Sequence, residues 1–339
     1  MAGSYNNGGN AYDGLSLLDK VIIDVFTNAY VTNRELSLFN FVSGQKSKFY
    51  YNDVSLTGGL TVFSDNLTDN GTFSSVQKQG DMIDLAFPVK ISNDMLKGTV
   101  YENRYAPGVP QRFEDQAEHL SALSQLMAGR VGRQLDQIAI LGDTTVATPW
   151  GVGNYAMNGL VKLFSATVGS DVTVKPTPAV GGITAANFGA ELDKMIEAAD
   201  ADENLRYLTQ DRDPAKRGRF YVAFDVFRKG EAWLRNSGQY FFSPSESVYL
   251  NGQPVIYRYG HYEVVLMEHF PAGTVAFTST MNITFAYDRE DDIRTLRIQN
   301  LNDETNPSDI FQNYTKFLLR FRFGMAVHRL SEVVWYDPS

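Results

Sequence analysis

The clearest hydrophobic pattern in the chain lies between residues 112 and 141, where apolar residues recur every three or four positions. This spacing is typical of an amphipathic α-helix with one apolar stripe along its length. A helix of that length spans roughly 45 Å and is well above the ordinary mean. Acidic residues lead the segment, which suits the positive end of the helix dipole. Gly142 follows it at the position expected for a C-terminal cap, so the sequence predicts one very long helix that ends there.

The stretch from residue 47 to residue 91 has a different, strand-like pattern. KFYYNDVSL, GLTVFS and MIDLAFPVKI resemble strands, and the polar stretch DNLTDNGTFSSVQKQGD (65–81) is expected to connect the second to the third. A long two-stranded excursion of this kind has little core of its own and needs a surface to lie on. Its exposed edges also favour strand pairing with another chain. Tyr50, Tyr51 and Lys78 are therefore candidate subunit contacts.

Shorter elements follow the long helix. Residues 185–200 predict a second helix, and RFYVAF (219–224) predicts a buried strand. Asp225 is expected to cap a short helix directly after that strand. VYLNGQPVIYRY (248–259) predicts a hairpin, because Asn-Gly is the strongest short-range turn signal. Further strands are expected at YEVVLM, GTVAFTS, NITFAYD and, near the C-terminus, KFLLRFRF.

The N-terminal segment is polar at first and then amphipathic. Residues 1–14 are rich in glycine and asparagine and predict an extended arm. Residues 15–31 carry apolar positions with helical spacing and predict a helix.

Composition places the chain among globular proteins and narrows its chemistry. The 339 residues are 43% hydrophobic and 20% charged, with a net charge of −9. Negative charge argues against tight wrapping of nucleic acid, although it suits a protein that encloses nucleic acid without adhering to it. The chain has no cysteine, which excludes disulfides and zinc–sulfur sites. Because neither a signal peptide nor a long apolar run is found, we expect cytosolic synthesis and no membrane span.

Motifs that resemble enzyme sites fit structural roles better. GVGNYAMNG (151–159) lacks the third glycine and the preceding strand of a dinucleotide site. None of the four histidines has the helical partner of a zinc motif. No nucleophilic serine motif, phosphate-binding loop or carboxylate pair is found. We therefore expect no catalytic residue, no metal and no cofactor.

Two charged runs are expected to form contacts between copies. YDREDDIR (287–294) lacks the spacing and the central glycine of a calcium loop, so a solvated, salt-bridged loop is favoured. DRDPAKRGR (211–219) is basic at its end but has no interleaved aromatic residues, so we expect it to meet an acidic patch on a neighbouring copy. The candidate contact residues of the two runs are Asp288, Asp291, Arg217 and Arg219.

The order of these parts resembles the major capsid proteins of tailed bacteriophages that have the Hong Kong 97-type fold. In that family the long helix is the spine of a peripheral domain. It often ends in a Leu-Asp…Leu-Gly stretch, followed by a short turn like Pro-x-Gly-Ile-x-Asn and, later, a Leu-x-Gly-x-Pro-Val hairpin. The resemblance spans nearly the whole chain. The matching residues are Leu135, Asp136, Leu141, Gly142, Pro149, Gly151, Asn154, Leu250, Gly252, Pro254 and Val255.

The resemblance implies an α+β fold with four parts. These are an N-terminal arm (1–46), an extended β-hairpin loop (47–91), a peripheral domain with the long spine helix (92–170 and 295–339) and an axial domain (171–294). It implies a structural protein, not an enzyme, that self-assembles through hexamers and pentamers into an icosahedral head shell. The shell would enclose double-stranded DNA without sequence-specific binding. Portal, scaffold and decoration proteins are the further partners it suggests, and the expected location is the virion, after synthesis in the host bacterial cytoplasm.

Several alternatives stay open at this point. An encapsulin-type shell has the same fold but packages enzymes; the polar N-terminal arm favours a phage head, and shell size separates the two. An αβ enzyme would need a polar pocket, for which the sequence offers no motif, and the long helix argues against another virion part. Some relatives cross-link a loop lysine to an asparagine of a neighbour. Lys78 and Lys90 are the lysines concerned here, and no motif selects the asparagine.

Overall fold

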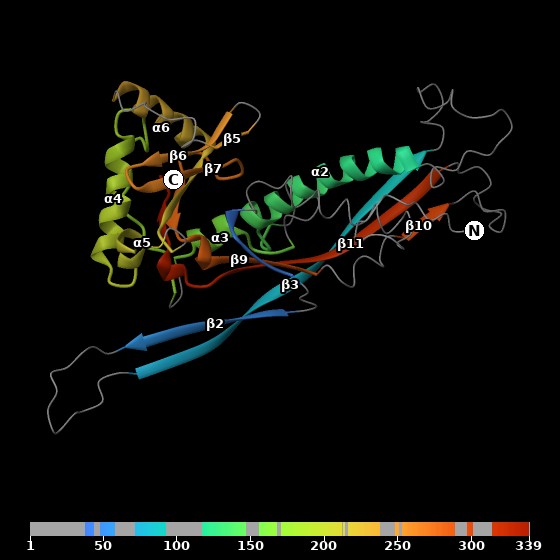
Figure 1. The fold of residues 1–339 in the computed structure, drawn as a ribbon, viewed down its shortest axis with the longest axis horizontal. Coiled ribbons are helices and arrows are strands. Elements are labelled where there is room, and N and C mark those ends of the chain that lie inside the picture. The colour runs from blue at the N-terminus through green and yellow to red at the C-terminus, as the bar shows by residue number, and fades with distance from the viewer. Residues whose placement is uncertain are drawn as a thin grey trace. The chain divides into compact units, whose positions relative to one another are not determined.

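The computed structural model of the chain divides into two compact units (Figure 1). Unit 1 comprises Met1–Leu38, Ile83–Gly159 and Tyr287–Phe323, and unit 2 comprises Phe39–Met82, Leu160–Ala286 and Gly324–Ser339. The four-part division expected from the resemblance stays a prediction. The residues that the structure describes are 38–43, 48–57, 72–92, 117–146, 156–167, 171–211, 213, 216–237, 248–250, 253–288, 297–300 and 314–338.

The main element of unit 1 is the long helix α2 (Ala117–Leu141). It confirms the predicted helix over the part of 112–141 that the structure describes. Three members of the predicted apolar stripe, Val131, Leu135 and Ile138, are buried. Unit 1 also contains β10 (Arg297–Asn300), which pairs antiparallel with β11 (Tyr314–Val327).

Two glycines meet where α2 ends. Gly142 N still donates to Ile138 O at 3.0 Å, and Gly159 N donates to Gly142 O at 2.7 Å. A Cβ at Gly159 would lie 2.6 Å from Gly142 N, and a Cβ at Gly142 would collide with the carbonyl oxygens of Met157 and Ile138. Gly142 follows Leu141, the last residue of α2, as predicted, although it does not adopt the left-handed conformation common for a glycine cap. Glycine is required because two backbone segments touch. PWGVGN (149–154) lies outside the described residues.

Unit 2 is built on a six-stranded sheet with the order β12-β8-β4-β7-β6-β5. β4 and β7 are parallel neighbours, and the other printed pairs are antiparallel. These strands confirm the predicted buried strand, the Asn-Gly hairpin and the two strands after it. They are β4 (Arg219–Ala223), β5 (Val248–Leu250), β6 (Gln253–Tyr259), β7 (Tyr262–Met267), β8 (Val275–Thr278) and β12 (Val334–Tyr336).

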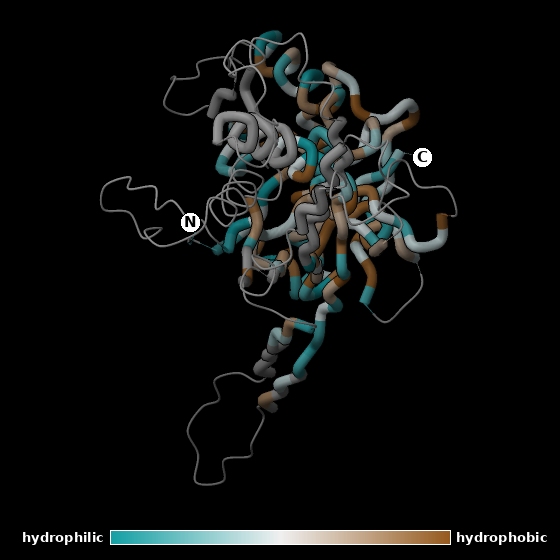
Figure 2. The backbone as a smooth tube through the Cα atoms, turned by 90° about the vertical axis from the view of Figure 1, so that its right-hand side faces the viewer, coloured by the Kyte–Doolittle hydropathy of each residue, from teal (hydrophilic) through white to brown (hydrophobic). Residues whose placement is uncertain are grey.

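Helices of unit 2 pack against this sheet and complete its core. Their buried side chains include Phe188 and Leu192 of α4 and Phe227 of α6. Figure 2 marks the hydrophobic stretches of the chain in brown. The helices are α3 (Leu160–Ser165), α4 (Phe188–Ala201), α5 (Arg206–Gln210) and α6 (Phe224–Asn236), with short 3-10 turns η5 (Thr280–Asn282) and η8 (Leu330–Glu332).

The predicted helix at 185–200 is confirmed by α4, but the predicted cap at Asp225 is wrong. The cap position of α6 is Ala223, because the helix follows β4 without a linker. Asp225 lies in the first turn, where its carboxylate accepts hydrogen bonds from Lys229 Nζ at 2.8 Å and Gly273 N at 2.9 Å. These two donors lower the pKa of Asp225, although partial burial opposes them.

A second sheet has the strand order β1-β9-β11-β3-β2, with β10 attached to β11. Its further members are β1 (Asn40–Ser43), β2 (Lys48–Thr57), β3 (Thr72–Ser92) and β9 (Ile283–Asp288). β2 confirms the strand at KFYYNDVSL. The interpretation of 65–81 as a connection is wrong from residue 72 onward, because residues 72–81 form the first part of β3 and pair with all of β2. GLTVFS, the N-terminal arm (1–14) and the helix at 15–31 lie outside the described residues.

Candidate functional site

The base of the β2–β3 hairpin is fixed by one buried aromatic side chain. Phe49 is 2% exposed and packs against Ala286 and Ala326. Its cross-strand partner is Gly80, where a Cβ would collide with the Phe49 ring. A Cβ at Gly324 of β11 would lie 3.2 Å from Phe49 Cε1. Because neither glycine has a side chain, the Phe49 ring has room to pack against both of them.

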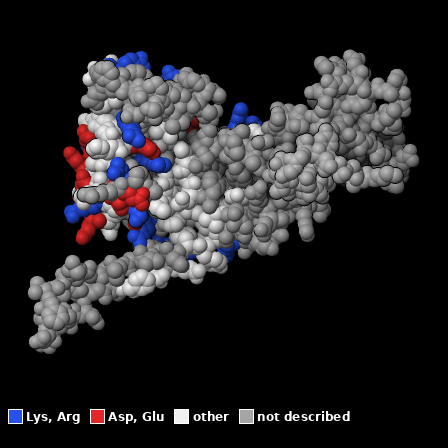
Figure 3. All heavy atoms as spheres, in the orientation of Figure 1, with Lys and Arg blue, Asp and Glu red and all other residues white. Residues whose placement is uncertain are grey.

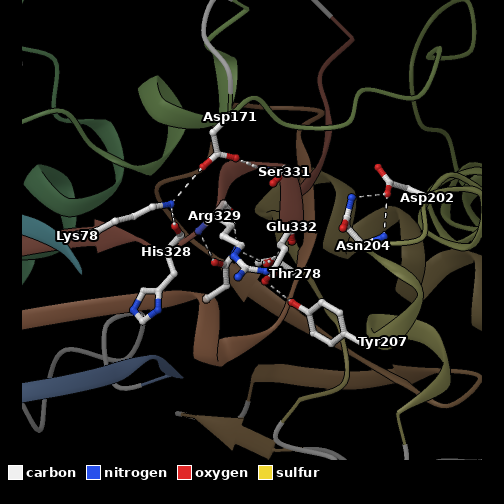
Figure 4. Close-up of polar contacts among 11 residues, drawn as sticks. Lys78, Asp171, Asp202, Asn204, Tyr207, Thr278, His328, Arg329, Ser331 and Glu332 are labelled. Atoms are coloured by element: carbon white, nitrogen blue, oxygen red, sulfur yellow. Dashed lines mark hydrogen bonds and ion pairs between the residues drawn. The ribbon is translucent and has the colours of Figure 1, made fainter. Parts of the chain in front are cut away.

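The next cross-strand pair, Tyr51 and Lys78, binds the segment that follows β11. Lys78 Nζ donates to the carbonyl oxygen of His328 at 2.9 Å and lies 3.9 Å from Asp171 Oδ2. The Tyr51 ring stacks on the His328 imidazole with centroids 4.4 Å apart, and its hydroxyl donates to Val327 O at 3.5 Å. Figure 4 shows Lys78 between Asp171 and His328. We name Tyr51, Lys78, Asp171 and His328 the hairpin clasp.

The segment that the clasp binds is itself held by a polar cluster (Figure 4). Arg329 N donates to Asn282 Oδ1 at 2.9 Å, and Asn282 Nδ2 donates to Arg329 O at 2.9 Å. The Glu332 carboxylate accepts from Arg329 Nη1 at 2.8 Å and from the Tyr207 hydroxyl at 2.7 Å. Burial, and then the Glu332 charge, raise the pKa of Tyr207 far above its ordinary value, so the hydroxyl stays a donor. The hairpin clasp thus binds a segment that is itself held in place by hydrogen bonds.

Lys78→Met is expected to loosen the hairpin base and leave unit 2 folded. It removes one hydrogen bond and one partly exposed ion pair, which together contribute about 1 kcal/mol. Asp171 also accepts from Ser331 N at 2.6 Å, which keeps that carboxylate in place. Hydrogen exchange should become faster in 48–51. The control is Lys48→Met, whose exposed ammonium contacts Gln79 Oε1 at 3.3 Å; equal exchange in both variants would contradict the clasp.

The opposite face of the hairpin is exposed. Directly paired residues of an antiparallel ladder lie on the same face, so the register places Tyr50, Gln79, Gln77 and Phe73 together. Tyr50 is 59% exposed and Phe73 is 68% exposed. Two large aromatic side chains this exposed on a narrow ribbon are typical of an interaction surface.

The other predicted contact residues do not gather at the clasp. Arg219 Nε pairs with Glu263 at 2.8 Å, and Arg217 Nε donates to Asp211 O at 3.2 Å. Their contact with a neighbouring copy stays a prediction. Of Asp288 and Lys90 the structure describes the backbone alone, and Asp291 lies outside the described residues.

The sequence suggested Tyr51 and Lys78 as contacts between copies, a role that stays a prediction, and it did not indicate their partners within the chain. Lys78 and His328 are 250 positions apart, and no local pattern links them. Phe49 belongs to the Phe-Tyr-Tyr run that was already assigned to a strand, and the facing Gly80 was a usable signal, because an aromatic ring often covers a cross-strand glycine.

Within the described ranges, no group of three or more His, Asp or Glu side chains is placed to hold a metal ion. In the same part of the chain, every helix is too short or too polar to cross a membrane.

The fold is that of phage capsid proteins. A chain of the procapsid of satellite phage P4, a particle that includes the size determination (Sid) protein, is 14% identical, with 93% of this chain and 98% of that chain covered and a TM-score of 0.53. A capsid chain of a native GTA particle is 15% identical, with 91% and 89% covered and a TM-score of 0.51. A chain of Mycobacterium phage Adephagia is 8% identical, with 90% and 89% covered and a TM-score of 0.51. No protein-family model and no curated protein matches the chain.

These structures confirm, at the level of the fold, the resemblance that the order of motifs indicated. The mixed α+β architecture agrees with them.

Proposed function

We propose that this chain is a major capsid protein whose copies tile a closed icosahedral shell around a phage genome. The observation that carries the proposal is the shared fold, which covers 93% of this chain and 98% of the P4 procapsid chain. Nearly complete coverage of both chains means that they share a whole architecture and not one common substructure. Because a fold alone does not define a function, the exposed hairpin supplies independent support.

The hairpin suits a subunit that is completed by its neighbours. A two-stranded ribbon is only marginally stable by itself, and its outer face exposes Tyr50 and Phe73. Covering that face with another copy removes apolar surface from water. A copy that both gives a hairpin and receives one forms a head-to-tail contact, and such contacts generate rings when the rotation between copies closes. Hexamers and pentamers in one shell are the assembly we propose.

The finer features of the proposal follow from the resemblance and the charge. The resemblance implies the arm, extended loop, peripheral domain and axial domain of the Hong Kong 97-type fold. The net charge of −9 suits a container that holds double-stranded DNA without sequence-specific binding. Scaffold, portal and decoration proteins are its further partners, and synthesis takes place in the host bacterial cytoplasm. We do not propose a cross-link at Lys78, because its ammonium binds the clasp of its own chain.

Electron microscopy and light scattering of the purified full chain test the proposal. We expect closed icosahedral shells. Their diameter distinguishes a phage head from a small encapsulin-type compartment, which is the alternative with the same fold. A compact monomer that persists under all assembly conditions would overturn the proposal.

A further inference from the structure

Helix α4 of unit 2 exposes an acidic face. Asp193, Glu197 and Asp200 occupy exposed positions at the i, i+4 and i+7 spacing of one helical stripe. The neighbouring Lys194 does not neutralise them, because its ammonium binds the buried carboxylate of Glu191 at 2.6 Å. We name the three exposed carboxylates the acidic face.

Two carboxylates of the acidic face accept hydrogen bonds from hydroxyl groups. Asp193 accepts from the Tyr259 hydroxyl at 2.8 Å, and Asp200 accepts from the Thr209 hydroxyl. Both donors are neutral. Like charges four positions apart, such as Asp193 and Glu197, weaken a helix when nothing offsets them. The Arg206 side chain lies at one end of this face, where its Nε donates to the backbone oxygen of Asp200 at 3.0 Å.

The adjacent helix α6 exposes two arginines on one side. Phe224, Arg228 and Arg235 occupy exposed positions there, with the half-exposed Glu231 between the two arginines, and we name the three exposed residues the basic face. The Arg228 guanidinium lies over the Phe224 ring, 5.2 Å from its centroid, although Phe224 is still 51% exposed. Lys229 lies beside this stripe and binds Asp225 at 2.8 Å.

The two faces are held in fixed positions on one unit. Phe188 of α4 packs on Trp233 of α6 with ring centroids 6.0 Å apart. A Cβ at Gly189 would lie 2.8 Å from the Trp233 ring, and a Cβ at Gly230 would lie 2.6 Å from Phe188. The helices therefore pack closely. Figure 3 shows red side chains along the edge that α4 occupies, with blue ones among them, and blue side chains over the part that α6 occupies.

We propose that the basic face of one copy of this chain docks on the acidic face of the next copy. The inference rests on the proposed function, because it names the contact that the shell would use. A head-to-tail interface requires two different, complementary surfaces on one rigid unit, and the two faces meet that requirement. Arginine and exposed aromatic residues are also enriched at protein interfaces.

Nucleic acid fits the basic face less well than a second copy does. Binding to a phosphate backbone needs several clustered cations. The basic face has two arginines, and it lies beside an acidic helix on a chain of net charge −9.

A charge-swap experiment on the full chain tests the contact. Glu197→Lys and Arg228→Glu each place like charges in the proposed interface, and each should raise the protein concentration for half-assembly about tenfold. The double variant should return to within about twofold of the unchanged protein, because the swapped pair attracts again. The two single variants move the net charge in opposite directions. An effect of overall charge would therefore have opposite signs in them, whereas the proposed contact weakens in both.

Arg130→Glu, at an exposed position of α2, is the matched control for Arg228→Glu and should assemble normally. Circular dichroism establishes that each variant folds. Glu197→Lys should keep α4 folded, because the new lysine forms an attractive pair with Asp193. If Arg228→Glu unfolds, Arg228→Ala replaces it. Normal assembly of both single variants, or no recovery in the double variant, would overturn the contact. The proposed function would still stand in that case if the unchanged protein forms shells. Absence of shells from the unchanged protein would overturn both.

Discussion

Gly142→Ala should destabilise unit 1 by about 3 kcal/mol, because the new methyl group has no space. It would collide with the carbonyl oxygens of Met157 and Ile138. These are backbone atoms, which cannot rotate aside as a flexible side chain can. The end of α2 must therefore shift, and the hydrogen bond from Gly159 N to Gly142 O at 2.7 Å would be lost or weakened.

Gly129→Ala is the matched control, because it makes the same change in the same helix. No described atom lies within 4 Å of a Cβ at Gly129. Alanine there should stabilise the protein by about 0.5–1 kcal/mol through its higher helix propensity. Urea denaturation of the unassembled protein, followed by circular dichroism, measures both changes. Equal midpoints for the two variants would show that the backbone crossing does not require glycine.

The long helix was predictable because its information is local. Val131, Leu135 and Ile138 repeat at helical spacing, and their burial follows from that spacing. The strands of the main sheet in unit 2 were predictable for the same reason, since runs such as YEVVLM are short and mostly apolar. The role of Gly142 was not predictable, because the sequence does not show which backbone segment crosses it.

The first part of β3 and the hairpin clasp depended on contacts between distant residues. Residues 72–81 are mostly polar, since the exposed ribbon does not require an apolar face, and hydrogen bonds to β2 define the strand. Lys78 can donate to the His328 carbonyl oxygen only when strands β3 and β11 lie side by side in the sheet. Tyr51 and Lys78 were expected to contact a neighbouring copy; both make contacts within their own chain, and a contact with another copy stays a prediction.

Phe49→Ala should lower the free energy of unfolding of unit 2 by about 3 kcal/mol, as is typical for removing a buried aromatic ring. Phe49 is 2% exposed and packs on Ala286 and Ala326, which are too small to fill the cavity. Gly80, opposite Phe49 in the ladder, offers no side chain to replace the ring. Urea denaturation measures the loss, and faster hydrogen exchange in 48–51 would locate it at the hairpin base.

Phe73→Ala makes a matched comparison, because Phe73 belongs to the same hairpin but is 68% exposed. Its removal should change the stability of the unassembled chain by less than about 0.5 kcal/mol. If the outer face of the hairpin docks on a neighbouring copy, Phe73→Ala should nevertheless impair shell formation, whereas Phe49→Ala should impair both folding and assembly. Normal shells from a well-folded Phe73→Ala protein would show that Phe73 does not take part in the contact between copies. Comparing Phe49→Ala with Phe73→Ala thus distinguishes the contacts that hold the hairpin to its own chain from the contacts that it makes with a neighbouring copy.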